Sequence, residues 1–175
     1  SMGFNGELTA REEPIKDSSF NPPATDKLEL GWAGIGQSTT LVNPTHFLAI
    51  MGAIANGGEG YAPDRISSIG GESGTRTPEV MISVNPETAR QLDYLLRSNI
   101  KNEYGDYRFP DLEMCGKTGT AQITGATSHS WFVGYSQRDD LPLAVVCIAE
   151  NAGSGMGTAV NVSNEVMQYF LENPY

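Results

Sequence analysis

The stretch Met114-Cys-Gly-Lys-Thr-Gly-Thr-Ala-Gln-Ile123 decides which fold and function this chain is expected to have. It is typical of a β-strand, in which alternate side chains share a face, so Lys117 and Gly119 point one way. Thr118 and Thr120 point the other way, unless a twist or bulge re-aims one of them. A glycine inside a strand usually marks the close approach of a ligand or of another backbone. Lys117 offers a point charge to an anionic group, and the neighbouring strand edge can offer backbone N–H groups to a developing oxyanion.

Two other interpretations of these residues are open at this point. A phosphate-binding loop that ends in Gly116-Lys117-Thr118 needs another glycine five positions before Gly116, where Asp111 stands, and this argues strongly against such a loop. The second interpretation is a solvated strand lysine beside a glycine bulge, with no ligand. The sequence on either side of the strand shifts the balance away from both.

The stretch resembles the third signature of the penicillin-binding transpeptidases and serine β-lactamases, which is Lys-Thr-Gly followed by Thr, at Lys117 to Thr120. Ser128 to Tyr135 and Leu143 to Ala149 resemble the next two strands of that family. Gly34 to Gln37 and Ala53 to Gly58 resemble the helical segment that precedes its sheet, most of all in the high-molecular-weight penicillin-binding proteins.

The resemblance covers nearly the whole chain from about Gly31, and it is strongest at Lys117 to Gln122. Asn43-Pro44-Thr45 departs from it, because a Thr is expected before the Pro. The resemblance implies an α+β fold: an antiparallel sheet of three main strands flanked by helices, a truncated β-lactamase/transpeptidase-like fold. We expect residues 3–175 to be the C-terminal part of a penicillin-binding transpeptidase domain and residues 1–2 to be a cloning remnant.

The composition limits the classes of function. The chain has 175 residues, of which 39% are hydrophobic, enough for one domain with a core. No apolar run approaches the roughly 20 residues that span a bilayer. The net charge is -10, from 11 Lys and Arg against 21 Asp and Glu, which argues against nucleic-acid binding because that requires a basic face. An anionic substrate must therefore be met by a few well-placed cations.

In the first half of the chain, residues 1–30 are polar and rich in turn formers, and we expect an irregular segment there. Asn43-Pro44 predicts a helix start, with Asn as N-cap and Pro at the first helical position. Asn56-Gly57-Gly58 predicts the end of that helix. Between Tyr61 and Val84, short β-branched runs around Gly70, Gly71 and Gly74 predict a small hairpin.

Asn85-Pro86 predicts a second helix start, and a last helix is expected from about Thr158. The expected apolar face of the second helix consists of Ala89, Leu92, Leu95, Leu96 and Ile100. The expected inner face of the last helix consists of Val162, Val166, Met167 and Phe170.

Three strands are expected between these helices, at about 112–123, 130–136 and 142–149. The short polar link 137–140 predicts that the last two form an antiparallel hairpin. In the family two further strands pair with the last of these, so the resemblance implies an open apolar edge near 142–149. We expect the chain to cover this edge by forming a homodimer or by folding its N-terminal segment over it. Cys115 and Cys147 would lie about 10 Å apart on strands that flank a third, as free thiols beyond disulfide reach.

The family's reaction requires a serine nucleophile in Ser-x-x-Lys, then Ser-x-Asn, then Lys-Thr-Gly. Ser98-Asn-Ile-Lys101 fits the first pattern, but it falls at the C-terminal end of a predicted helix, which opposes a developing anion. Ser19-Phe-Asn21 and Ser83-Val-Asn85 fit the second pattern, but both precede Ser98, so the order is wrong. We therefore expect the nucleophile and the second motif to lie outside this chain, which would be inactive alone.

By resemblance, Lys117 holds the substrate electrostatically, and Thr118 and Thr120, on either side of Gly119, bond its carboxylate or a neighbouring serine. The backbone N–H of Thr120 forms half of an oxyanion hole. The implied substrate is the D-Ala-D-Ala stem peptide of peptidoglycan, or a β-lactam that mimics it and forms an acyl-enzyme. The resemblance further implies that the longer protein containing this chain is a membrane-anchored D,D-transpeptidase outside the cytoplasmic membrane. The alternative is a β-lactam sensor or non-catalytic binding domain on the same scaffold.

The remaining candidate residues favour structural roles. His46 and His129 are the two histidines, and His129 lies between two serines, so a Ser-His-Asp triad is an alternative that only spatial proximity can establish. Trp131 and Phe132 are interpreted as core and sheet-face aromatics. Asp139-Asp140 is interpreted as a solvated turn, because no calcium-loop pattern follows. No metal or cofactor is expected.

Overall fold

A three-stranded antiparallel sheet carries the motif strand at one edge. Its strands are β7 (Met114–Ile123), β8 (Ala126–Ser136) and β9 (Ala144–Ala149), in the order β7-β8-β9. The predicted α+β fold, the antiparallel sheet and the final hairpin are therefore confirmed. Strand β8 begins four residues earlier than predicted, because Gly125, with φ of 75°, closes a tight turn directly after β7.

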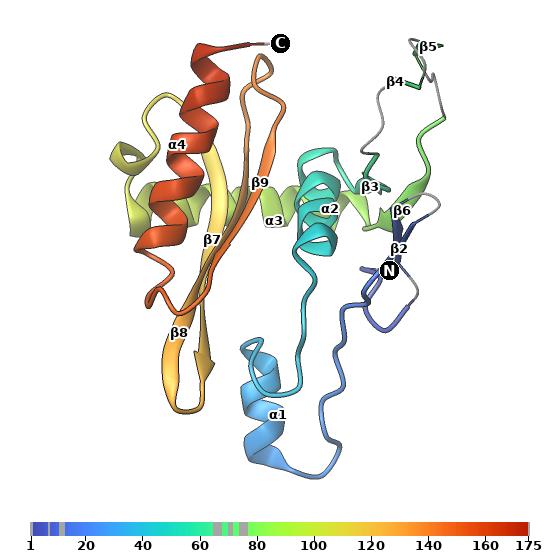
Figure 1. The fold of residues 1–175 in the computed structure, drawn as a ribbon, viewed down its shortest axis with the longest axis vertical. Coiled ribbons are helices and arrows are strands. Elements are labelled where there is room, and N and C mark those ends of the chain that lie inside the picture. Colours follow the sequence, from blue (N-terminus) through green and yellow to red (C-terminus); the bar gives the residue numbers. More distant parts are fainter. Residues whose placement is uncertain are drawn as a thin grey trace. The chain divides into compact units, whose positions relative to one another are not determined.

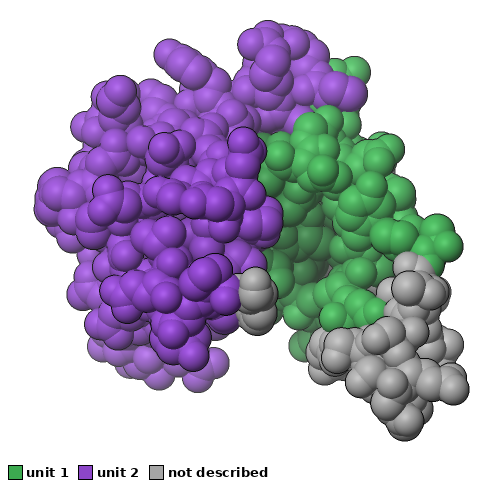
Figure 2. Space-filling view, turned by 90° about the horizontal axis from the view of Figure 1, so that it is seen from above, with its two compact units in different colours: residues 1–85 green, residues 86–175 purple. Residues whose placement is uncertain are grey.

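The computed structural model describes residues 2–6, 8–10, 13–64, 68–69, 72–73 and 77–174. The chain divides into two units, residues 1–85 and residues 86–175, and the sheet belongs to the second (Figures 1 and 2).

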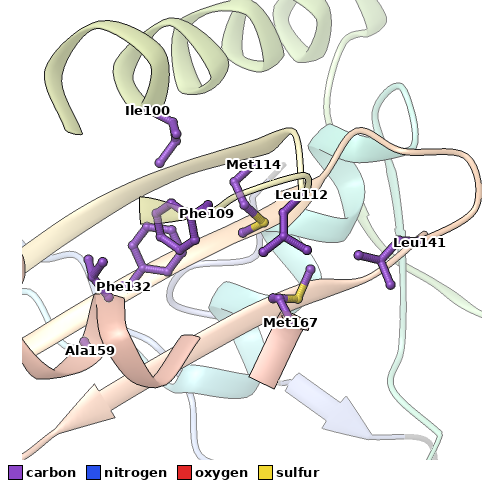
Figure 3. Close-up of a cluster of buried hydrophobic side chains, with 9 residues drawn as sticks. Ile100, Phe109, Leu112, Met114, Phe132, Leu141, Ala159 and Met167 are labelled. Carbon is purple, nitrogen blue, oxygen red and sulfur yellow. The ribbon is translucent and has the colours of Figure 1, made fainter. Parts of the chain in front are cut away.

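Helix α4 (Thr158–Glu172) covers one face of this sheet (Figure 1). Figure 3 shows the core beneath it, formed by Ile100, Phe109, Leu112, Met114, Phe132, Leu141, Ala159, Val160 and Met167. The predicted inner face of this helix is wrong at Val162 and Val166, which are 41% and 42% exposed. The buried side instead carries the small residues Ala159 and Ser163, which let the helix axis lie close to the strands.

Helix α3 (Pro86–Asn99) covers the opposite face of the sheet (Figure 1). Its Asp93 accepts a hydrogen bond of 2.8 Å from the hydroxyl of Tyr135 on β8. Ala89 and Ile100 are fully buried as predicted, but Leu95 is 59% exposed. The predicted apolar face was thus too wide by one residue, because Asp93 and not Leu95 faces the sheet.

The segment between α3 and β7 is built from two short helical turns. A π-helical turn (Ile100–Tyr104) continues α3, and Gly105 ends it with φ of 88°. A 3-10 turn (Asp106–Arg108) follows. Arg97 fixes this segment by donating to both carboxylate oxygens of Asp106, at 2.6 and 2.9 Å, and to the carbonyl of Met114 at 3.2 Å.

The described part of the first unit includes the helices α1 and α2. Helix α2 (Pro44–Ala55) begins where the sequence predicts, because the Asn43 side chain accepts from the Thr45 N–H at 2.9 Å. The helix ends at Asn56, and Gly57 follows with φ of 69°. Helix α1 (Lys27–Gly34), capped by Asp26, begins inside the segment predicted to be irregular.

The strands of the first unit are short. Antiparallel pairs join β1 (Leu8–Ala10) to β2 (Glu13–Ile15), β3 (Glu59–Tyr61) to β6 (Val80–Ser83) and β4 (Ser68–Ile69) to β5 (Glu72–Ser73). The pair β4–β5 confirms the predicted hairpin, whereas the predicted turn residues Gly70, Gly71 and Gly74 lie outside the described residues. Across the described ranges, no helix is both long and apolar enough to cross a membrane.

Candidate functional site

The motif residues lie where strand β7 emerges from the core. Met114, Cys115 and Gly116 are buried, and the next residue, Lys117, is exposed. Thr118 and Gly119 are half-buried and Thr120 is exposed. The lysine and the two hydroxyls are thus displayed on a strand at the margin of a sheet, as the sequence predicts.

The outer edge of β7, the edge not paired with β8, presents backbone groups of alternate residues. The carbonyl of Gly116 accepts from the Asn99 side chain at 2.8 Å, and the N–H of Thr118 donates to the Tyr104 hydroxyl at 3.2 Å. Neither group therefore points toward β8. Because ladder direction alternates along an antiparallel strand, the N–H of Thr120 points to the same outer edge. This is the direction that an oxyanion donor at Thr120 requires.

The hydroxyl of Tyr104 lies at the centre of this edge, and sequence reasoning did not identify it. It accepts from the Lys117 ammonium at 3.2 Å and lies 2.8 Å from Thr118 Oγ1. Lys117 also donates to the Thr118 carbonyl at 3.0 Å. Burial raises the pKa of the Tyr104 phenol, but hydrogen bonds from Thr118, Asn99 and Lys117 outweigh burial and hold this pKa below its ordinary value.

The glycine-rich loop of residues 151–157 packs against the same end of β7. The N–H of Gly155 donates to Thr120 Oγ1 at 3.1 Å. A Cβ at Gly155 would collide with the Gly119 carbonyl and lie 2.9 Å from Thr118 Cβ, so only glycine fits there. This close approach depends on the missing side chain of Gly155; a Cβ at Gly119 would instead lie 3.2 Å from Trp131 Cβ.

The structure does not form the triad considered from the sequence. The Nδ1 atom of His129 accepts from the backbone N–H of Asn151 at 3.0 Å. The Ser130 hydroxyl donates to the Ser154 carbonyl at 2.8 Å and accepts from the Ala159 N–H at 3.1 Å. Both side chains thus hold the glycine-rich loop and the start of α4 on the sheet. His46 is buried in α2, and burial lowers its pKa against the opposing hydrogen bond to the Met2 carbonyl.

The formal Ser-x-x-Lys match lies where the sequence places it, at the C-terminal end of a helix. Ser98 is the penultimate residue of α3, and its hydroxyl accepts from the Asn102 side chain at 2.9 Å. Lys101 lies in the π-helical turn and is exposed. An amide that donates to the hydroxyl does not activate the serine as a nucleophile.

The thiols and carboxylates near the sheet have structural surroundings. Cys115 and Cys147 are free, as predicted. Burial, reinforced by the charge of Asp93, raises the pKa of the Cys115 thiol to about 12, so it is not a nucleophile at neutral pH. Asp140 pairs with Arg138 at 2.7 Å in the turn before β9. Among the residues whose positions the structure gives, no cluster of three or more His, Cys, Asp or Glu side chains could hold a metal ion.

Comparisons with known proteins agree with this geometry. A family model described as the penicillin-binding protein transpeptidase domain matches residues 4–169. The peptidoglycan D,D-transpeptidase MrdA of Haemophilus influenzae is 26% identical over 162 residues, which are 79% of this chain and 25% of that protein. The peptidoglycan D,D-transpeptidase PbpA of Mycobacterium tuberculosis is 25% identical over 164 residues, covering 86% of this chain and 33% of that protein. The chain therefore spans about a quarter to a third of these relatives.

Solved structures show the same fold. The crystal structure of PBPA from Mycobacterium tuberculosis has a TM-score of 0.83 at 23% identity and covers 97% of this chain and 44% of that one. The D,D-transpeptidase domain of a peptidoglycan glycosyltransferase from Eggerthella lenta has a TM-score of 0.75 at 26% identity, covering 98% of this chain and 45% of that one.

Proposed function

The chain belongs to the penicillin-binding protein transpeptidase domain family, and from this premise we propose that residues 3–175 are the C-terminal part of a peptidoglycan D,D-transpeptidase domain. The longer protein that contains them is called the parent protein below. In it, the outer edge of β7 forms the wall of the cleft that binds the stem peptide or a β-lactam. We place the parent protein outside the cytoplasmic membrane, anchored to it, by its kinship with enzymes of peptidoglycan.

The exposed end of β7 carries this proposal. The chain has a net charge of -10, so its overall field repels a carboxylate. The exposed Lys117 supplies a local positive charge that can attract one. Thr118 and Thr120 supply hydroxyls beside it, and the Thr120 N–H points off the same edge. Losing one donor of an oxyanion hole typically costs about 2.7–4 kcal/mol of transition-state stabilisation. Structures of penicillin-binding protein A from Mycobacterium tuberculosis as imipenem and penicillin G acyl-enzyme complexes support β-lactams as ligands.

The serine nucleophile and the second motif, in this proposal, lie outside residues 1–175. Ser98 supports this view, because the C-terminal end of a helix opposes the anion that a nucleophilic serine must develop. The hydroxyl of Ser130, the serine nearest to Thr120 in the ladder register, is already used by Ser154 and Ala159. The chain alone is therefore expected to hold ligands weakly and to form no acyl-enzyme.

The chain alone is also expected to form a homodimer through β9. This strand is paired only with β8 among the described strands. Ile148 on β9 is 37% exposed. An unpaired strand edge of this kind is a template for another strand.

Labelling with fluorescent penicillin tests the proposal. The parent protein is expected to form a covalent adduct that survives denaturing electrophoresis, whereas the 175-residue chain forms none. An adduct on the 175-residue chain would show that the nucleophile lies within it. A parent protein that forms no adduct would contradict the transpeptidase assignment. An acylated parent protein that fails to cross-link stem peptides would instead support a sensor or binding domain.

A further inference from the structure

The phenol of Tyr104 has an unusual set of partners for a side chain outside the motif. The Lys117 ammonium and the Thr118 N–H both donate to its oxygen at 3.2 Å. Both partners are donors only, so the phenol must use its own proton elsewhere. Thr118 Oγ1, at 2.8 Å, can accept that proton, and the side chain of Asn99 is the other partner that carries an acceptor atom.

The bond between Tyr104 and Thr118 orients the Thr118 hydroxyl. If Tyr104 donates to Thr118 Oγ1, the Thr118 hydroxyl is free to turn its own proton toward another acceptor. Lys117 has three N–H donors, and the Tyr104 oxygen and the Thr118 carbonyl engage two of them. No contact described for the third N–H engages it, so it can donate to an anion. A lysine carries a flexible four-carbon stem with high rotamer entropy, so ordering it before binding reduces the cost of binding.

The backbone that delivers Tyr104 is itself irregular. Tyr104 is the last residue of the π-helical turn, which is closed by a hydrogen bond of 2.7 Å from Gly105 N–H to the Ile100 carbonyl. Single π-helical turns interrupt α-helices rarely and are frequent at functional sites. An ordinary helical continuation of α3 would rotate residue 104 away from its present direction, because each turn would contain fewer residues.

We propose that Tyr104 is a positioning residue for ligand binding: its phenol holds the Lys117 ammonium and the Thr118 hydroxyl in the arrangement that receives the carboxylate of the ligand. This inference rests on the proposed function of the β7 edge. Tyr104 acts through Lys117 and Thr118 and does not itself touch the ligand. Its removal therefore weakens the binding of carboxylate ligands more than it slows the chemical step.

The test is made on the parent protein with two forms of one fluorescent penicillin, the free carboxylate and its carboxylate ester. Tyr104→Phe is expected to raise the dissociation constant of the pre-acylation complex about tenfold for the carboxylate, the size of one hydrogen bond to a charged group. The first-order acylation step and the rate with the ester are expected to stay unchanged. The matched control is Tyr107→Phe, because Tyr107 is 76% exposed and the phenylalanine ring keeps its contact with Arg108.

A double-mutant cycle sharpens this test. In a Lys117→Ala background, Tyr104→Phe is expected to cause a smaller loss than in the unsubstituted protein, since only the part of its effect that passes through Thr118 remains. Equal losses with the carboxylate and the ester, or an unchanged carboxylate affinity, would overturn the positioning role. Failure of the unsubstituted parent protein to be acylated at all would instead overturn the proposed function, so the two failures are distinguishable.

A second measurement applies if Tyr104→Phe fails to fold. In parent protein labelled with ¹³C at tyrosine Cζ, the Tyr104 phenol is expected to titrate at a higher pH in the Lys117→Ala variant than in the unsubstituted protein. The reason is that the variant loses one of the donors that stabilise the phenolate. An unchanged titration would show that the contact between Tyr104 and Lys117 is absent, and the inference would be wrong.

Discussion

The two outer edges of the same three-stranded sheet differ in how their backbone groups are treated. Along β7, side chains from the segment directly before the strand bond alternate residues: Arg97 bonds Met114, Asn99 bonds Gly116 and Tyr104 bonds Thr118. Along β9, the described strands offer a partner on one side only. Side chains of the same unit thus bond backbone groups on the outer edge of β7. The described strands leave the outer edge of β9 without a paired strand.

The difference supports the proposal that the β7 edge binds a small ligand. The side chains that hydrogen-bond the outer edge of β7 reach as far as Thr118. The next residue on that edge is Thr120, which is polar and exposed. A bare edge such as β9 instead selects for strand pairing, because a row of unpaired backbone groups recognises another backbone. This contrast is the reason for proposing ligand binding at the β7 edge and chain association at the β9 edge.

The largest expected effect comes from removing the core that both edges share. Phe132 is fully buried and stacks on Phe109 with ring centroids 5.1 Å apart. Phe132→Ala is expected to lower the free energy of unfolding by about 3–5 kcal/mol, since it leaves a cavity between the sheet and α4. Urea denaturation of the 175-residue chain measures this loss. Tyr94→Ala, at a side chain that is 71% exposed, is the control and should change little; equal losses in both variants would contradict the described core.

A smaller effect is expected at the buried end of the β7 edge. Arg97→Met removes the bonds to Asp106 and to the Met114 carbonyl, and it is expected to cost about 1 kcal/mol of unfolding free energy at neutral pH, since the partly exposed pair is screened by solvent. The control is Arg90→Met, whose partner Glu87 is exposed, and it should have no measurable effect.

The pH dependence of the Arg97→Met effect has a definite sign. The hydrogen bond from Arg97 holds the pKa of Asp106 below its ordinary value. A carboxylate with a depressed folded-state pKa stabilises the fold at pH values above its unfolded-state pKa, which is about 3.9 for Asp. That contribution is lost as the pH falls through the folded-state pKa. The difference between the unsubstituted chain and the variant should therefore shrink in acid. A difference that grows in acid would contradict the ion pair.

The smallest expected change in stability concerns the β9 edge. Ile148→Lys places a charge on the open strand, and it is expected to shift the 175-residue chain toward monomer in sedimentation velocity, with the unfolding free energy changed by less than about 0.5 kcal/mol. Tyr94→Lys makes the same kind of change on α3, away from the edge, and should leave association unaltered. A monomer already at high protein concentration before any substitution would show that β9 does not mediate association.

The sequence predicts the β7 edge well in one respect and poorly in another. The motif at Lys117 to Thr120 predicts an exposed polar strand, because such residues at strand spacing are costly to bury. Tyr104 was not predicted, because the extra residue of a π-helical turn leaves no mark on the periodicity of α3. The phenol reaches the strand only because that turn redirects the backbone.

The helix faces show a second limit of sequence periodicity. The spacing of apolar residues predicted both α3 and α4 correctly as helices. It did not predict that Leu95, Val162 and Val166 are exposed, because periodicity identifies an apolar stripe without showing what packs on each part of it. The buried side of α4 includes the small residues Ala159 and Ser163, and their low hydrophobicity gives them little weight in a sequence pattern.

The rate of acylation of the parent protein by fluorescent penicillin, with and without Lys117→Ala, tests the assignment of ligand binding to the β7 edge most directly. Removing the ammonium deletes a charge-assisted contact to the ligand carboxylate, so the second-order rate constant should fall about a hundredfold. Lys101→Ala, at an exposed lysine of the neighbouring π-helical turn, should leave the rate constant unchanged. Equal rate constants for Lys117→Ala and the unsubstituted protein would contradict the account.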